Sequence, residues 1–304
     1  MKTSKGVFRL MSFALVMGIV VLGSCSKERV EPVEEEEQLN EYQSMNDYYD
    51  TKKQDEQEFT IDTSGTQPIV GHEGTKIYPS KERLMFANGD SVQWPYTVKL
   101  IELYPAKDML YYQMPTVGGG DLLTSHGEVK ITAFKDGEEL VLRPNRTWPI
   151  EMPNSVPETG MKTYYGSASG SIVDWVNSPT GSFTTTTYGY ATEMKKLGWI
   201  SCAKDPNFSS ANVNYTFTST TDNLTTVSKF IYFPDSKGLM QLYANSASNL
   251  PEGENIKIIF LGIDGSGQLF HYFSETDVSS SSNSVSVTMT AISDADLTAI
   301  LDNL

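Results

Sequence analysis

Residue types that commonly perform catalysis or bind metals are few in this chain. Their spacing along the sequence forms no recognisable catalytic or metal-binding motif. The 304 residues include three histidines, His72, His126 and His271, and two cysteines. His72 precedes Glu73 and His126 lies two residues before Glu128, but a metal site needs three or four converging ligands. We therefore interpret the histidines as loop or strand-edge residues. The sequence predicts no metal site, no cofactor and no catalytic residue, so the chain is not expected to be an enzyme.

Two glycine-rich stretches could be mistaken for ligand-binding loops. "VGGGD" (117–121) has no following lysine or helix to complete a phosphate site, and "GIDGSGQ" (262–268) offers one carboxylate where calcium needs several. Both stretches are typical of hairpin turns. Carboxylates are numerous elsewhere, and because their separation in space is invisible in a sequence, a glycosidase pair stays open as an alternative.

Aromatic side chains are the candidates for a contact surface. Trp94, Tyr111, Trp148 and Tyr164 combine a flat apolar ring with a polar atom, which suits them to stack on sugars or to bind proteins. Two of them begin tyrosine pairs, and adjacent residues of a strand face opposite sides of the sheet. One tyrosine of each pair is thus available for exposure, although burial in a core is the alternative for each aromatic residue.

Short strand-forming runs must position these side chains. They are rich in Val, Ile, Tyr, Phe and Thr, and turns containing Gly, Asn or Asp separate them. The clearest runs are "YTVKLIELY" (96–104), "GEVKITAF" (127–134), "SKFIYF" (228–233), "NIKIIFLGI" (255–263) and "NSVSVTMTAI" (283–292). Two stretches look helical, "YATEMKKLG" (190–198) and "SDADLTAILDNL" (293–304), the second with Ser293 as a cap.

This pattern predicts an all-β fold of two antiparallel β-sandwich domains. We expect the first domain over residues 67–197 and the second, with its short C-terminal helix, over residues 198–304. The helical segment and the following "LGWISC" would form the joint. Residues 67–304 are too many for a single β-sandwich of ordinary size.

The N-terminus carries a targeting segment. Lys2, Lys5 and Arg9 precede an apolar stretch of 13 residues from position 10 to 22, too short to span a bilayer but suited to a signal peptide. Leu22-Gly23-Ser24-Cys25 resembles the lipobox of bacterial lipoproteins, which implies cleavage after residue 24 and a diacylglycerol on Cys25. An ordinary signal peptide is the alternative. Lipidation leaves Cys202 as the only thiol, which we expect to be a small buried filler.

A strongly acidic stretch follows the lipidation site. Residues 26–66 carry 13 acidic and four basic residues, and the whole chain has a net charge of −15. We predict that residues 25–66 form a disordered tether. The charge argues against nucleic acid and against anionic lipid headgroups as partners. The membrane is expected as a partner only through the lipid on Cys25.

The start of the acidic stretch indicates a location. Ser26-Lys27-Glu28 and the glutamates after it resemble the export signal of surface lipoproteins in Bacteroidota-type bacteria. This resemblance predicts the outer membrane, with the protein exposed at the cell surface. A spacer on a periplasm-facing lipoprotein is the alternative.

A longer resemblance covers roughly residues 70–205. "GTKIYPSKERLMFANGDSVQWPYTVKLIELY", "KDMLYYQMPTVGGGDLLTSHGEVKITAFKDGEELVL", "MKTYYG", "VDWV" and "LGWISC" are similar to an uncharacterised family of Bacteroidota lipoproteins whose first part resembles a ZU5-like β-sandwich. The resemblance implies a fold and a class of organism, and transfers no site residues.

Taken together, these patterns predict a non-catalytic outer-membrane lipoprotein with a binding or structural role at the cell envelope. Two alternatives stay open. One is a glycan-binding lipoprotein of a polysaccharide-uptake system, and the other is a fimbrial-type subunit or adhesin. The partners would be a polysaccharide or an envelope protein.

Overall fold

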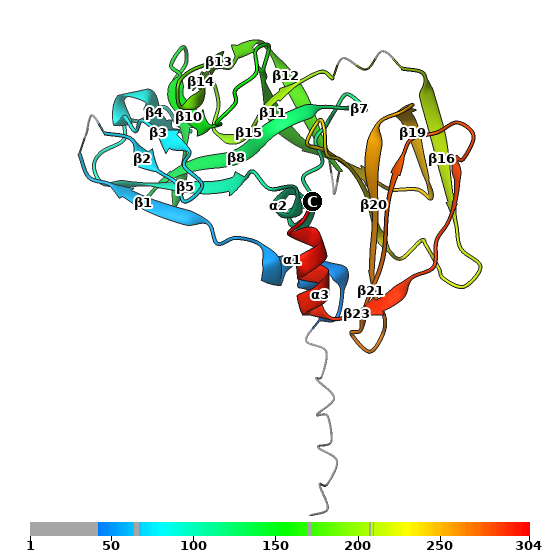
Figure 1. Ribbon diagram of the computed structural model, residues 1–304. Coiled ribbons are helices and arrows are strands. Elements are labelled where there is room, and N and C mark those ends of the chain that lie inside the picture. The colour runs from blue at the N-terminus through cyan, green and yellow to red at the C-terminus, as the bar shows by residue number, and fades with distance from the viewer. Residues whose placement is uncertain (1–41, 64–66, 170–171, 207, 209) are drawn as a thin grey trace, which may run out of the picture. The chain divides into compact units, whose positions relative to one another are not determined.

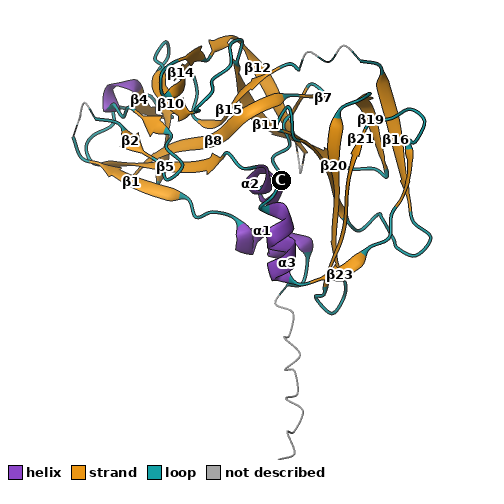
Figure 2. Ribbon diagram, viewed as in Figure 1, coloured by secondary structure: helices purple, strands orange, loops and turns teal. Residues whose placement is uncertain are grey.

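Strands dominate the computed structural model, which describes residues 42–63, 67–169, 172–206, 208 and 210–304 (Figures 1 and 2). Nearly all neighbouring strands are antiparallel, and in the described part of the chain only the pair β16 (Asn212–Thr218) and β22 (Ser284–Ser286) is parallel. The predicted all-β fold of antiparallel sheets is confirmed.

The first sandwich consists of two sheets. The first sheet has the order β1 (Gln57–Ile61), β5 (Tyr96–Leu103), β8 (Thr124–Lys135), β15 (Gly198–Lys204), β11 (Lys162–Ser169) and β12 (Ile172–Ser182), with β9 (Glu138–Leu142) and β4 (Leu84–Phe86) attached beside the 3-10 turn η1 (Lys81–Arg83). The second sheet has the order β13 (Thr184–Thr185), β14 (Gly189–Met194), β10 (Trp148–Pro153), β3 (Lys76–Ile77) and β2 (Ile69–Val70). A separate hairpin joins β6 (Val117–Gly118) to β7 (Asp121–Leu122).

The second sandwich also has two sheets. The third sheet of the protein has the order β19 (Ser246–Pro251), β16 and β22. The fourth has the order β18 (Gly238–Leu242), β17 (Ser228–Phe233), β20 (Asn255–Ile263), β21 (Leu269–Asp277) and β23 (Thr290–Ile292).

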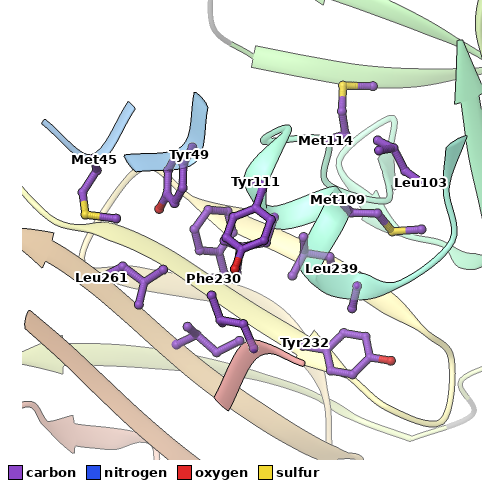
Figure 3. Close-up of a cluster of buried hydrophobic side chains, with 14 of the residues drawn as sticks. Met45, Tyr49, Leu103, Met109, Tyr111, Met114, Phe230, Tyr232, Leu239 and Leu261 are labelled. Atoms are coloured by element: carbon purple, nitrogen blue, oxygen red, sulfur yellow. The ribbon is translucent and has the colours of Figure 1, made fainter. Parts of the chain in front are cut away.

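Each sandwich has its own core, and a third core, which we call the shared core, joins the two. Strand β17 shows how one sequence serves two cores. Its side chains alternate, so that Ile231 and Phe233 lie in the core of the second sandwich while Phe230 and Tyr232 lie in the shared core (Figure 3). The first and fourth sheets are therefore buried on both faces, which explains their nearly continuous apolar runs.

Three helices complete the shared core. They are α1 (Met45–Lys52), α2 (Ala106–Tyr111) and α3 (Asp294–Leu301), and each buries its apolar side chains there. Backbone hydrogen bonds also link the two sandwiches. Thr116 N, for example, donates to Leu239 O at 2.8 Å. The residues that the structure describes thus form one compact unit.

Several local predictions are confirmed. "VGGGD" forms the β6–β7 hairpin, in which Gly119 and Gly120 have φ of 65° and 90°, values that favour glycine. "GIDGSGQ" forms the turn between β20 and β21. Helix α3 begins after Ser293, whose side chain accepts a hydrogen bond from Asp296 N.

The predicted tether of residues 25–66 is wrong over its second half. Helix α1 and strand β1 are ordered elements of the fold, and β1 pairs with β5 along its whole length. Met45, Tyr48 and Tyr49 are buried in the shared core. The acidic residues of this segment lie mainly on its exposed side, so a net charge taken over the whole segment concealed the apolar stripe. Residues 25–41 lie outside the described residues.

Two predicted elements are wrong. The helix expected over residues 190–198 is strand β14 followed by the start of β15, because pairing with β10 outweighs the helix propensity of Ala, Glu, Met and Lys. The single strand expected over residues 283–292 is divided into β22 and β23, which belong to different sheets.

The boundary predicted between residues 197 and 198 falls inside the first sandwich. Strand β15 pairs with β8 on one side and with β11 on the other. The chain enters the second sandwich only at β16. The predicted boundary therefore lies one strand before the chain enters the second sandwich.

Candidate functional site

Three of the four aromatic residues predicted to form a contact surface are buried. Trp148 is fully buried, and Tyr111 and Tyr164 are each 3 % exposed. The prediction that they are available to a ligand is wrong.

The physical reason is the shared core. Tyr164 faces the shared core and its neighbour Tyr165 faces the core of the first sandwich, so neither side of β11 offers a tyrosine to solvent. Tyr111 lies on helix α2, not on a strand, and points among the side chains of the shared core (Figure 3). Trp148 lies on the inner face of β10, whose buried residues alternate with half-buried residues of the outer face.

Trp94 is the one candidate that keeps exposed surface. It is half-buried, its ring stacks on Tyr96 with centroids 5.2 Å apart, and Lys81 Nζ lies 5.4 Å from the ring centroid. The aromatic candidates thus do not meet in one place. Cys25, the predicted lipidation site, lies outside the described residues. Cys202 is free and buried as predicted, and burial raises the pKa of its thiol well above the ordinary value.

A pocket of about 390 Å³ lies instead on the second sheet, and we call it the outer-face pocket. It is formed where β10 pairs with β14. In this pair Pro149 stands opposite Glu193, and Glu151 stands opposite Ala191. These four residues alternate with the core residues of their strands, so their side chains share the outer face. The other lining residues are Tyr78, Ile150, Thr180, Gly181, Ser182, Thr184, Thr192 and Lys195.

The two carboxylates of the pocket are held in place by neighbours. Glu151 Oε1 accepts a hydrogen bond of 2.8 Å from the Tyr78 hydroxyl, and Lys76 Nζ lies 3.3 Å from Glu151 Oε2. Glu193 Oε2 accepts one of 2.6 Å from Thr147 Oγ1 and lies 3.7 Å from Arg83. Each carboxylate therefore has a basic partner, and each keeps lone pairs for a further donor.

The pocket could have been found from the sequence by a different reading of residues 190–195. Tyr190, Thr192 and Met194 alternate with Ala191, Glu193 and Lys195, which is the period of a strand with one buried face. The helix interpretation hid this alternation, and so it hid the outer face on which the pocket lies.

A second cluster of polar side chains surrounds His126, for which the predicted position is wrong. It was expected in a loop or at a strand edge, but it lies buried in β8. Its Nδ1 atom lies 2.7 Å from Asn154 Nδ2, and its Nε2 atom lies 3.2 Å from Glu158 Oε1. Because Asn154 Oδ1 already accepts from Val156 N at 2.8 Å, the amide nitrogen must face the ring. Nδ1 is then the acceptor, and the neutral ring carries its proton on Nε2.

We expect this histidine to make the protein less stable in mild acid. Burial, together with the positive charge of Lys237, lowers the pKa of His126 below its ordinary value of 6.5. Below pH 6.5 the unfolded chain binds a proton that the folded chain binds only at lower pH, so the free energy of unfolding falls as the pH falls. Urea titrations between pH 7.5 and pH 5 should show that the free energy of unfolding falls less in His126→Gln than in the wild type. An identical fall in the two proteins would contradict the role of His126 in this pH dependence.

Comparisons with known proteins do not place this chain in a family. No family model, no curated protein and no solved structure matches it. The resemblance to a ZU5-like lipoprotein family therefore stays a prediction. In the part of the chain that the structure describes, no three His, Cys, Asp or Glu side chains come together as a candidate metal site. No helix among the described residues is long and apolar enough to cross a membrane.

Proposed function

We propose that this protein is a lipid-anchored, non-catalytic protein of the outer membrane that acts by binding at the cell surface. The observation that carries the proposal is the N-terminal sequence, in which a basic start and a short apolar stretch lead to Leu22-Gly23-Ser24-Cys25. The acidic residues after Cys25 support a location at the cell surface, on the outer side of the outer membrane.

The outer-face pocket supports binding over catalysis. A glycosidase needs one carboxyl group kept protonated by an apolar surrounding. Glu151 and Glu193 instead each lie within 3.7 Å of a basic nitrogen, and the side chain of Glu193 is 57 % exposed. The pair is thus arranged to accept hydrogen bonds from a ligand.

The fimbrial alternative is not favoured by the first strand. That alternative requires the strand to leave the fold. Gln57 of β1 donates to Glu102 Oε2 at 2.9 Å and accepts from His72 N at 2.8 Å, and Ile61 is buried. Removing β1 would break this network and expose the core below it.

Replacing the lipidation site tests the proposal. We expect the full chain, produced in a bacterium that processes lipoproteins, to pellet with the outer membrane and to carry acyl chains on its N-terminal peptide in mass spectrometry. The variant Cys25→Ala should lose both properties, because no acyl acceptor remains at the cleavage site. The control Cys202→Ala removes the other thiol and should keep both.

Protease treatment of intact cells tests the surface location. The wild-type protein should be degraded while a periplasmic marker survives. If Cys25→Ala still pelleted with the outer membrane, the lipid anchor would be overturned. If the protein survived protease treatment of intact cells, the surface location would be overturned.

A further inference from the structure

We propose that the outer-face pocket binds a neutral saccharide, through its carboxylates, its hydroxyl groups and a small apolar floor. The inference rests on the binding function proposed above and names the class of ligand. It concerns a different set of residues from the aromatic candidates that the sequence suggested.

The floor of the pocket offers an apolar surface of limited size. Pro149 and Ala191 lie on the outer face of the second sheet, diagonally across the β10–β14 pair, and both are half-buried. A sugar ring has weakly polar C–H faces that pack on such a surface, while its hydroxyl groups point sideways. The volume of about 390 Å³ lies at the lower end of ordinary ligand sites, which span roughly 300–1,000 Å³.

The wall of the pocket is dense in hydrogen-bonding groups. Thr180, Ser182 and Thr184 are exposed and line one side, and each hydroxyl can both donate and accept. Glu151 and Glu193 lie on neighbouring strands of the floor and accept only. A carboxylate with two oxygens can take hydrogen bonds from two adjacent hydroxyl groups of one ring. A polyhydroxylated ligand matches this set of donors and acceptors.

The charges of the pocket favour a neutral ligand. Lys76 and Arg83 already pair with the two carboxylates, so neither cation is free to pair with an acidic sugar or a phosphate. A cationic sugar would have to compete with Lys76 and Arg83, which already pair with Glu151 and Glu193 from outside the pocket. Lys195 adds a further positive charge at the rim, where it contacts Thr180. A neutral sugar needs no change in these pairs.

The pocket is also prepared before a ligand arrives. The Tyr78 hydroxyl fixes Glu151, and Thr147 fixes Glu193. Thr192 Oγ1 donates to Ser182 O at 2.9 Å, which ties the floor of the pocket to its wall. Groups that are already oriented lose less conformational entropy on binding.

Calorimetry and ligand-observed NMR on the full-length lipoprotein in detergent test the inference. The probes are cellotetraose, maltotetraose and mannotetraose as neutral sugars, tetragalacturonate as an acidic one and the glucosamine tetramer as a cationic one. We expect at least one neutral tetrasaccharide to bind with a Kd below ~1 mM. The variant Ala191→Gln places a larger side chain on the floor, and it should weaken binding at least about tenfold.

Matched variants separate the site from general effects. Glu193→Gln removes an acceptor and should also weaken binding about tenfold or more, whereas Glu139→Gln changes an exposed glutamate outside the pocket and should leave it unchanged. Both pocket residues point away from the core, so the thermal midpoint of each variant should stay close to that of the wild type.

The outcomes distinguish the inference from the function on which it rests. Failure of all neutral probes, stronger binding of a charged probe, or equal affinity in Ala191→Gln would overturn the saccharide site and leave the lipid anchor intact. Loss of the anchor in the fractionation experiment would overturn the proposed location and leave the pocket intact. Cleavage of a bound tetrasaccharide, read by mass spectrometry, would support the site and overturn the non-catalytic role.

Discussion

Replacing Glu102 with alanine is expected to lower the free energy of unfolding by about 3 kcal/mol or more. Glu102 belongs to β5 and is fully buried. Its carboxylate accepts hydrogen bonds from Gln57 Nε2 at 2.9 Å, from Glu73 N at 3.0 Å and from Thr75 N at 2.8 Å. Alanine would leave all three donors without this acceptor. Gln57 and Thr75 are buried, and each buried unsatisfied donor costs roughly 1–3 kcal/mol.

The carboxylate also fixes the loop that leads into β3. A Cβ atom added at Gly71 would lie 2.3 Å from Glu102 Oε2, so the loop is packed directly against the carboxylate. Urea unfolding gives the loss of stability, and hydrogen exchange at Thr75 N should accelerate. The control is Glu58→Ala, an exposed residue of β1 paired with Lys99, which should change stability by no more than about 0.5 kcal/mol. Equal losses in the two variants would contradict the role of Glu102.

Replacing Glu128 with methionine is expected to stabilise the protein at neutral and alkaline pH by about 1–3 kcal/mol. Glu128 is fully buried in β8, and neither carboxylate oxygen has a hydrogen-bond partner among the described residues. Its register neighbours are Leu103 in β5 and Ser201 in β15. Burial raises the pKa of the Glu128 carboxyl well above its ordinary value of 4.5.

The sign of the pH dependence follows from this shift. Above pH 4.5 the unfolded chain releases the proton that the folded chain retains, so the folded state loses stability as the pH rises towards the raised pKa. The free energies of unfolding of the wild type and Glu128→Met should therefore differ least near pH 4, and the difference should increase above that pH. Glu128→Gln serves as the control, because it keeps the shape and cannot ionise, and its difference from the wild type should also grow with pH. A constant difference across this range would contradict a protonated Glu128.

The fold was predictable because strands are repeated, local patterns. The strand-forming residues of "GEVKITAF" and the glycine turns needed no knowledge of distant residues, and the strand and the turns appear in the structure as expected. The pairing of β15 was not predictable, because a strand gives no local sign of which sheet it joins. Helix α1 was missed for a similar reason, since its Tyr48 and Tyr49 acquire a buried surface only when distant strands supply it.

The site was less predictable than the fold. Tyr164 is a candidate only if one face of each sheet is exposed to solvent. The first sheet is buried on both faces, so this condition fails wherever the shared core covers it. The outer-face pocket depends on the pairing of Pro149 with Glu193, two residues that are 44 positions apart. No local motif contains both of them.

The joint between the sandwiches determines where mechanical tension would enter this fold. A pull transmitted along the chain from an anchor reaches the described structure at Tyr42, whose hydroxyl lies 3.2 Å from Asp294 Oδ2. Ten residues later Lys52 pairs with the same aspartate at 2.7 Å. Because Asp294 opens the last helix, and Leu297 and Leu301 of that helix lie in the shared core, the load would pass to the core that joins the two sandwiches. Tension that enters at Tyr42 would therefore first meet contacts with the last helix.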